Sequence, residues 1–115
     1  MESLNLCFYE AYTRLDKLCA ESYQTTKGIT RYIECMRSIY PKVSAGVPNW
    51  QEDLRKLVTL RHIRNHMSHN PGALREDSCG REDVAWLARF YERMLSGTDP
   101  LSLLRKNIAA EADRQ

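Results

Sequence analysis

The spacing of the apolar residues is the feature that most constrains how this chain folds. Along most of the sequence they recur at steps of three and four, as on one face of an α-helix, and no stretch alternates as a half-buried strand does. Proline and glycine interrupt this pattern at short intervals. We therefore expect an all-α protein, a bundle of about five helices with short connections. The predicted helices cover residues 3–24, 29–40, 50–68, 81–95 and 100–112.

Local signals mark several of the predicted helix ends. Asn49, with Glu52 three residues later, is expected to cap the third helix in a capping box. Asn70-Pro71-Gly72 is expected to end that helix, and Gly97 to end the fourth. Asp99-Pro100 is typical of a helix start, because proline at the first helical position gives up no internal hydrogen bond.

Composition narrows the class of protein further. The 115 residues suit a single domain, residues 1–115, and their 43% apolar content is enough for a hydrophobic core. A net charge of +2 is too small for a general nucleic-acid coat, so an anionic partner has to meet a local patch. Glu2 and interrupted apolar residues argue against a signal peptide, and no later segment is long enough to span a membrane. We expect a cytoplasmic protein with no membrane partner.

The cysteines are too widely spaced for a zinc knuckle, since no CxxC pair occurs among Cys7, Cys19, Cys35 and Cys79. Three of them fall on apolar helical positions. Buried free thiols in a reducing compartment are therefore expected in preference to disulfides.

The third predicted helix changes character halfway along. The core face of its first half is formed by Trp50, Leu54, Leu57 and Val58. The same face then continues with Arg61, Arg64, Asn65 and Ser68, while Leu60, Ile63 and Met67 keep a shifted apolar strip alongside. Unpaired, such polar groups cost several kcal/mol each to bury, so they must be paired, hydrated or facing a cleft. A cleft lined by arginines and bordered by histidine suits a phosphate group. A helix end whose charged side chains are simply solvated explains the same residues equally well.

The three histidines, His62, His66 and His69, all lie in this segment at spacings of four and three. They could share one flank of the helix as metal ligands. Helical zinc motifs, however, place a glutamate beside the first histidine, and this segment contains no acidic residue. We therefore expect no metal and no cofactor. His62 and His66 lie off the Arg64 stripe and are expected to face solvent.

The segment 64-RNHMSH-69 resembles the signature of the HEPN superfamily. That signature is an arginine, usually followed by a polar residue, and then a histidine after four to six intervening positions. Arg64, Asn65 and His69 occupy these positions here. HEPN domains are small all-α bundles that carry the motif toward the end of a long helix. The resemblance implies an HEPN-like fold and a metal-independent endoribonuclease, as found in bacterial defence and toxin–antitoxin systems.

The resemblance also implies roles for these residues in a homodimer whose two motifs face each other across one cleft. His69 would help the ribose 2′-OH attack the adjacent phosphorus, and Arg64 would stabilise the charge that develops. Asn65 would orient the histidine or bind a phosphate oxygen. The expected residues that bind substrate RNA are Arg61, Ser68 and His66. Arg61 is equally well explained by a salt bridge within the bundle.

Some alternatives stay open at the level of sequence. Some toxin members of the superfamily carry a tyrosine two residues after the histidine, where a partner enzyme modifies them; Pro71 holds that position here, which argues against such an antitoxin. An antitoxin or regulatory protein of another kind remains a conceivable partner. Trp86 and Phe90, four apart, are expected to stack on bases or form a dimer contact, and Trp50 to pack in the core. The rival function is a non-catalytic helical module that binds a protein or nucleic acid.

Overall fold

The computed structural model describes residues 3–39, 46–69 and 78–113, and the regular structure in those ranges is helical, with no strand. The predicted all-α class is confirmed. The elements are α1 (Leu4–Tyr23), α2 (Gly28–Ile39), α3 (Trp50–His69), α4 (Arg81–Ser96) and α5 (Pro100–Asp113). Their bounds lie within one residue of those expected from the periodicity.

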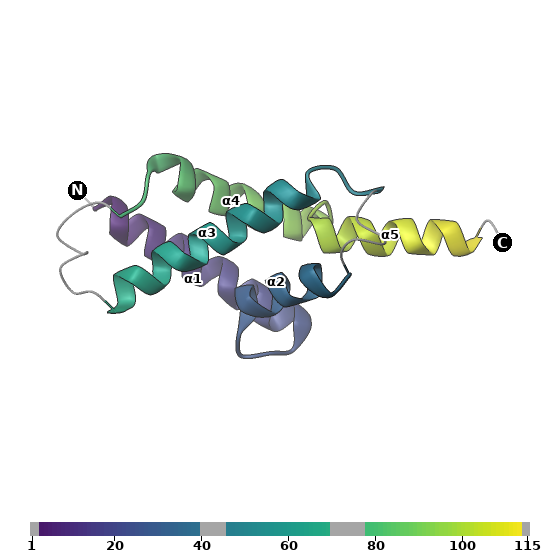
Figure 1. Ribbon diagram of the computed structural model, residues 1–115, viewed down its shortest axis with the longest axis horizontal. Helices are drawn as coiled ribbons and strands as arrows, with labels where there is room; N and C mark the ends of the chain where they lie inside the picture. Colours follow the sequence, from purple (N-terminus) through teal and green to yellow (C-terminus); the bar gives the residue numbers. More distant parts are fainter. Residues whose placement is uncertain (1–2, 40–45, 70–77, 114–115) are drawn as a thin grey trace.

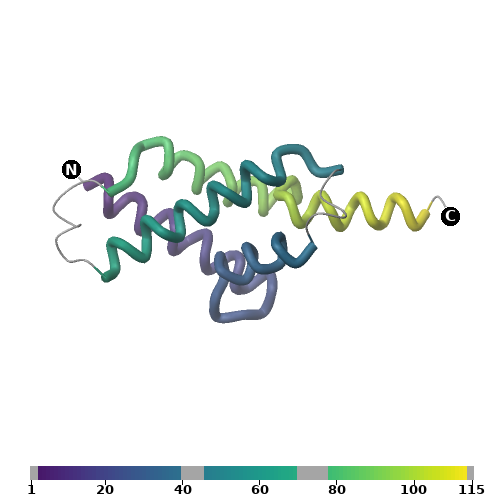
Figure 2. Tube along the Cα trace, in the orientation of Figure 1, coloured from purple at the N-terminus to yellow at the C-terminus, as the bar shows by residue number. Residues whose placement is uncertain are grey.

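The helices form an elongated body of 57 × 25 × 24 Å. α1 packs against both α2 and α4, and α2 also contacts α3. Figure 2 shows the short turn after α1, and the start of α2 lies against the last turns of α1, at Asp16 and Ala20. In Figure 1, α5 extends beyond the other helices and carries the C-terminus away from them. The part of the molecule that can enclose a site is therefore the bundle of α1 to α4.

The hydrophobic core lies where these four helices meet. Its fully buried large side chains include Phe8, Leu15, Tyr32, Ile33, Leu57, Leu60, Leu87 and Phe90. The Tyr32 ring meets the Phe90 ring edge-on, with the ring centroids 5.3 Å apart. The Trp86 ring stacks on the Phe90 ring, with the centroids 5.0 Å apart. Phe90 is only 1% exposed, so the prediction that it stacks on bases or forms a dimer contact is wrong. Trp50 is 3% exposed, which confirms that it packs in the core.

The buried side of α3 differs from the predicted one. Its buried residues are Trp50, Asp53, Leu57, Leu60 and Met67. Leu54 and Val58 are only half-buried. The buried side of α3 therefore follows the apolar strip that contains Leu60 and Met67. It does not continue along the polar residues that include Asn65. A step of three from Leu57 keeps Leu60 in the core, whereas repeated steps of four turn the side chains out of it.

α1 shows a similar rotation. In the sequence of this helix, Leu4, Phe8, Ala11, Leu15 and Leu18 recur at steps of three and four, with Cys7, Tyr12 and Cys19 beside them. The buried residues are instead Asn5, Phe8, Tyr12, Leu15 and Cys19. One result is that a polar amide, Asn5, faces the interior, where its Oδ1 accepts a hydrogen bond of 3.0 Å from the Ser78 N–H. That bond ties the start of α1 to the segment that leads into α4.

Two of the predicted end signals, Gly97 and Asp99, are confirmed; α3 begins after Asn49 as predicted, but the capping box expected there is not formed. Gly97 ends α4 with φ 74°, and its N–H donates to the Met94 carbonyl at 3.3 Å. Asp99 caps α5 by accepting a 3.4 Å bond from the Ser102 N–H. Asn49, by contrast, has φ 60° and is left-handed, whereas a side-chain N-cap needs extended backbone. The predicted stop at Asn70-Pro71-Gly72 falls outside the described residues.

Gly28 begins α2 and lies directly against α1. A Cβ atom at this position would stand 1.8 Å from the Asp16 carbonyl oxygen, so no other residue fits without moving a helix. The Asp16 side chain accepts a 2.8 Å hydrogen bond from the Ile29 N–H. α1 thus supplies the cap for the first turn of α2, and this contact sets the angle between the two helices.

The four cysteines are free, as expected. Cys19 and Cys79 are buried, and Cys7 and Cys35 are half-buried. Burial, together with the Asp16 and Asp99 carboxylates, raises the pKa of Cys19 to about 12. None of the helices described is long and apolar enough to cross a membrane.

Candidate functional site

The second half of α3 carries all of the predicted site residues, and the structure divides them into two groups. Arg61 and Arg64 are half-buried, whereas Asn65, His66, Ser68 and His69 are exposed. His62 is exposed as well, as expected. The arginines therefore lie toward the neighbouring helix, and the remaining polar side chains face outward. The predicted continuous polar face is not formed, because Asn65 and Ser68 turn away from the bundle.

Arg64 lies against two tyrosines of α1. Its guanidinium carbon is 5.6 Å from the centroid of the Tyr9 ring and 5.9 Å from that of Tyr12. Both distances are within the range of a cation–π interaction. Its Nε atom is buried without a hydrogen-bond partner in the part of the chain that the structure describes. A buried, unsatisfied donor on a cation is costly, and an acceptor oxygen of a ligand would satisfy it.

Tyr12 connects the two arginines electrostatically. Burial and then the Asp16 carboxylate raise the pKa of Tyr12, and the positive charges of Arg64 and then Arg61 lower it in part, so that the net pKa is about 12. Tyr12 is therefore a neutral phenol near pH 7. Within residues 3–39, 46–69 and 78–113, the ion pairs formed do not include Arg61 or Arg64. The salt bridge considered for Arg61 is not present among those residues.

Arg64 and His69 do not converge within one chain. Five positions along an ideal helix correspond to about 140° of rotation and about 7.5 Å of rise. The exposures agree with this geometry, because Arg64 is half-buried against α1 and His69 is exposed at the last residue of α3. One phosphate group cannot readily meet both side chains of the same subunit.

A pocket of about 320 Å³ opens where the start of α1 meets the end of α3. Its lining consists of Ser3, Asn5, Leu6, Tyr9 and Met67. Tyr9 belongs both to this pocket and to the contact with Arg64, so the pocket and the guanidinium are neighbours. The sequence interpretation missed Tyr9 and Tyr12. Their spacing of three on the first predicted helix was visible, but only the packing of α1 on α3 places them beside Arg64.

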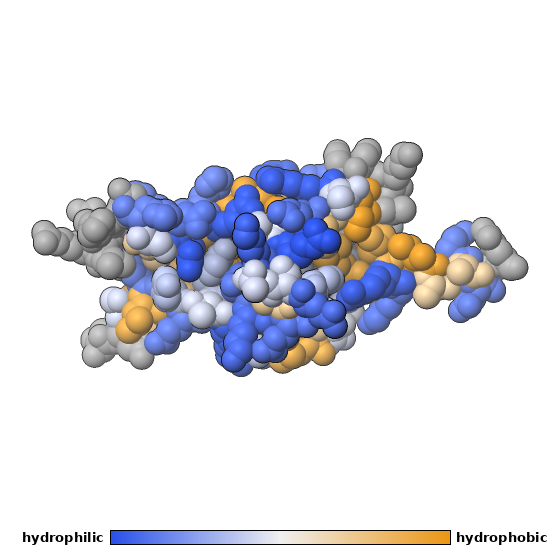
Figure 3. All heavy atoms as spheres, turned by 90° about the horizontal axis from the view of Figure 1, so that it is seen from below, coloured by the Kyte–Doolittle hydropathy of each residue, from blue (hydrophilic) through white to orange (hydrophobic). Residues whose placement is uncertain are grey.

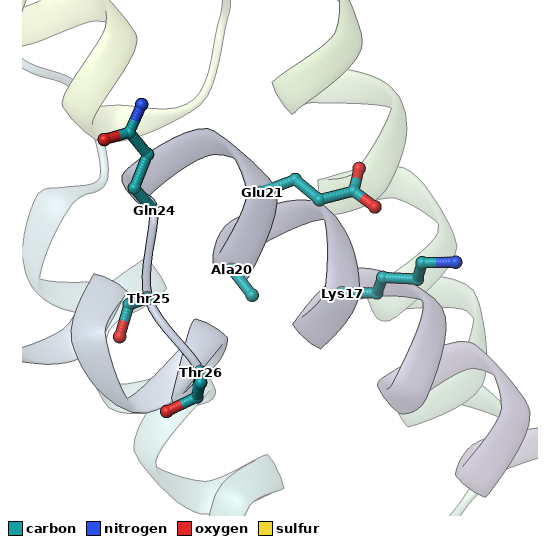
Figure 4. A pocket seen from close by; sticks show the side chains of 6 residues that line it. All are labelled: Lys17, Ala20, Glu21, Gln24, Thr25 and Thr26. Atoms are coloured by element: carbon teal, nitrogen blue, oxygen red, sulfur yellow. The ribbon is translucent and has the colours of Figure 1, made fainter.

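A larger hollow of about 610 Å³ lies at the turn between α1 and α2. It is lined by Lys17, Ala20, Glu21, Gln24, Thr25 and Thr26. Figure 4 shows Lys17 and Glu21 extending to one side, while Thr25 and Thr26 lie on the other. The polar groups diverge and do not meet around one point, so this hollow lacks the convergent groups of a binding site.

The metal alternative finds no geometric support in the described ranges. No three side chains among the His, Cys, Asp and Glu residues there are grouped closely enough to hold an ion. The three histidines of α3 all lie at exposed positions of the helix.

The chain belongs to the family DUF6548, a family of unknown function, which it matches over residues 6–115. The matched region includes α3 and the two tyrosines that contact Arg64. No curated protein and no solved structure matches the chain.

Proposed function

We propose that this protein is a metal-independent endoribonuclease of HEPN type that acts as a homodimer. Arg64 is the observation that carries this proposal, because its buried Nε–H has no hydrogen-bond partner among the described residues. Its guanidinium lies against the ring of Tyr9, and Tyr9 lines a surface pocket. The segment 64-RNHMSH-69 at the end of α3, in an all-α bundle, supports the same function. The HEPN-like arrangement of α1 to α5 and a cytoplasmic role in defence or a toxin system are parts of this proposal.

The proposed reaction needs only protein side chains and RNA. The imidazole of His69 takes the proton of a ribose 2′-OH, whose oxygen attacks the adjacent phosphorus. The bond from phosphorus to the 5′-oxygen breaks, and a second imidazole or a water protonates the leaving oxygen. The products are a 2′,3′-cyclic phosphate and a 5′-OH end. Arg64 stabilises the negative charge on the phosphorus oxygens, and Asn65 orients the histidine or the phosphate.

The divergence of Arg64 and His69 within one chain supports a composite site. In a two-fold dimer, Arg64 of one subunit and His69 of the other can meet across the interface. The exposed position of His69 at the end of α3 leaves it available for this purpose. Arg61, Ser68 and His66 then border the cleft as residues that bind the RNA backbone.

Incubation of the purified protein with mixed-sequence RNA in excess EDTA tests this function. Wild type is expected to cleave, His69→Ala to be slower by roughly 100-fold or more, and Arg64→Ala to be similarly impaired. His62→Ala is the matched control, because His62 is an exposed histidine of the same helix and is expected to behave as wild type.

The ends of the RNA products give a second readout. End-labelling should identify 5′-OH groups. Recovery of 5′-phosphate ends, or equal cleavage by all variants, would contradict the proposed reaction.

A non-catalytic interaction module is the second candidate. It is favoured by α5, which projects from the bundle, and by the apolar surface visible toward that end of the molecule (Figures 1 and 3). Leu95 on α4 is 59% exposed and Ile108 on α5 is 55% exposed. Binding of RNA or protein without cleavage at any protein concentration would favour this function over the nuclease.

A further inference from the structure

We infer that the pocket between the start of α1 and the end of α3 binds one unstacked nucleobase, with Tyr9 as the stacking surface, so that the substrate is single-stranded RNA. This inference rests on the proposed function and names the substrate class of the same site. It depends on three observations: the apolar lining of the pocket, the exposure of two of its side chains, and the contact between Arg64 and the Tyr9 ring that lines it.

The lining is suited to the flat face of a base. Leu6 and Tyr9 are 45% and 42% exposed, two of the four large apolar side chains that are most exposed in the described residues. Met67 is 3% exposed and adds a polarisable side chain to the pocket. Exposed apolar groups gathered at one hollow mark a contact surface, and an aromatic ring there offers stacking to any of the four bases.

The polar groups of the pocket are already used by the fold. The Ser3 hydroxyl caps α1 by accepting a 3.1 Å bond from the Leu6 N–H. The Asn5 Oδ1 accepts from the Ser78 N–H at 3.0 Å and lies 3.6 Å from the Cys79 Sγ. These groups are held in place by α1 and by the segment that precedes α4, and they are poorly placed to read the edge of a base. The pocket should therefore bind purines and pyrimidines with little discrimination.

Charge complementarity decides between a nucleotide and a purely apolar occupant. The guanidinium carbon of Arg64 lies 5.6 Å from the centroid of the Tyr9 ring that lines the pocket. Its buried Nε–H lacks an acceptor, and neither Arg64 nor Arg61 is neutralised by a carboxylate of the described residues. A nucleotide supplies both a base for the pocket and a phosphate for the guanidinium. A duplex base is stacked on both faces and cannot enter the pocket.

Fluorescence anisotropy with a labelled oligoribonucleotide of mixed sequence tests this pocket. The full-length His69→Ala protein is used so that binding is measured without cleavage. In that background, Tyr9→Ala is expected to weaken binding of the single strand by roughly 10- to 100-fold, and Tyr9→Phe by less than about twofold. The same strand annealed to its complement is expected to bind at least about tenfold more weakly than the single strand.

Two further variants keep the test decisive. Leu6→Ala removes a second exposed wall of the pocket and should also weaken binding, even if Tyr9→Ala is poorly folded. Tyr91→Ala is the matched control, because Tyr91 also contacts an arginine, Arg14, at 4.1 Å but lies outside the pocket. It should bind the single strand as the parent does.

The outcomes separate this inference from the nuclease function. Equal binding by Tyr9→Ala and the parent, or equal binding of duplex and single strand, would overturn the base pocket. So would a loss of the dimer in Tyr9→Ala by light scattering with unchanged RNA affinity, because the occupant would then be a second copy of the chain. Binding that depends on Tyr9 without any cleavage by wild type would support the pocket and overturn only the nuclease.

Discussion

Two ion pairs, formed by residues three apart on α3, connect that helix to α4. Asp53, with a side chain 8% exposed, receives two hydrogen bonds from Arg93, at 3.2 and 2.9 Å. Lys56 donates to Asp83 at 2.5 Å. The hydrogen bonding of Arg93 to the Asp53 carboxylate, which accepts, is the main reason why the pKa of Arg93 is raised. These contacts hold the helix of the proposed motif in register with α4, and Asp53 was not recognised in the sequence because it interrupts an apolar face.

Because of Asp83, the free energy of unfolding is expected to depend on pH in the acidic range. Burial opposes its ionisation, but the Gly80 N–H at 2.8 Å and the Lys56 ammonium outweigh this and lower its pKa below 3.8. A carboxyl group whose pKa is lower in the folded state stabilises the fold above its unfolded pKa. This stabilisation is lost as the pH falls through the folded pKa. We expect Asp83→Asn to cost about 1 kcal/mol at pH 7 and progressively less below about pH 4.

Thermal unfolding of wild type and Asp83→Asn is measured by circular dichroism from pH 7 to about pH 2.5. The two melting temperatures are expected to converge as the pH falls. Glu92→Gln, which changes an exposed carboxylate on the same helix, is the control. A constant difference between wild type and Asp83→Asn at every pH would show that the Asp83 carboxylate is not the cause.

Among the elements, α5 depends most on a few polar contacts. Only its first part is buried, through Pro100, Leu101 and Leu104. Beside it, the Tyr32 hydroxyl donates to the Asp99 Oδ2 at 2.5 Å and accepts from the Leu101 N–H at 3.1 Å. Burial and the Asp99 carboxylate raise the pKa of Tyr32, so the phenol keeps the proton that it donates. A single hydroxyl of α2 thus anchors the start of α5.

Tyr32→Phe tests this anchor. The change leaves the Asp99 carboxylate, which is 1% exposed, without its tyrosine donor, and it leaves the Leu101 N–H without its acceptor. We expect a loss of roughly 2 kcal/mol in the free energy of unfolding, because buried polar groups lose their partners. Hydrogen exchange of the amides in α5 should accelerate more than exchange in α1. Urea denaturation and exchange mass spectrometry measure the two effects.

Tyr23→Phe is the matched control for this substitution. Tyr23 packs edge-on against Tyr32 at 5.8 Å, and its buried hydroxyl has no hydrogen-bond partner in the described parts of the chain. Removing an unsatisfied hydroxyl should be neutral or slightly stabilising. Equal destabilisation by the two substitutions would mean that ring packing, and not the hydrogen bonds, holds α5.

At the scale of the whole molecule, the proposed site is incomplete in one chain. The groups around Arg64 lie at the junction of α1 and α3, while His69 is exposed at the end of α3. A composite cleft between two copies would bring together residues that a single chain keeps apart.

Mixing two inactive variants tests this arrangement. Arg64→Ala and His69→Ala, denatured together and refolded, should form about half heterodimers by random pairing. Each heterodimer would contain one intact pair, with Arg64 from one chain and His69 from the other. We expect RNA cleavage to return to roughly a quarter of the wild-type rate, with each variant refolded alone as the control. No recovery, despite heterodimers seen by native mass spectrometry, would contradict a composite site.

The sequence alone determined the all-α class and the bounds of the helices. Apolar periodicity, glycine and proline are local signals, and the hydrogen bonds of a helix are also local, so the two agree. Gly97 and Asp99 were identifiable for the same reason, because a helix end is set by the few residues around it. The segment 64-RNHMSH-69 was likewise visible as a motif, although its chemistry stays a prediction.

Only the tertiary structure decided which side of each helix became the interior. Two apolar strips run side by side on α3, and the sequence cannot rank them until another helix covers one; packing selected Leu60 and Met67 and left Asn65 exposed. The same packing placed Tyr9 and Tyr12, more than fifty positions away, beside Arg64. Contacts between distant segments depend on helix angle and rotation, which are set by shape and burial over the whole core and not by any short stretch of sequence.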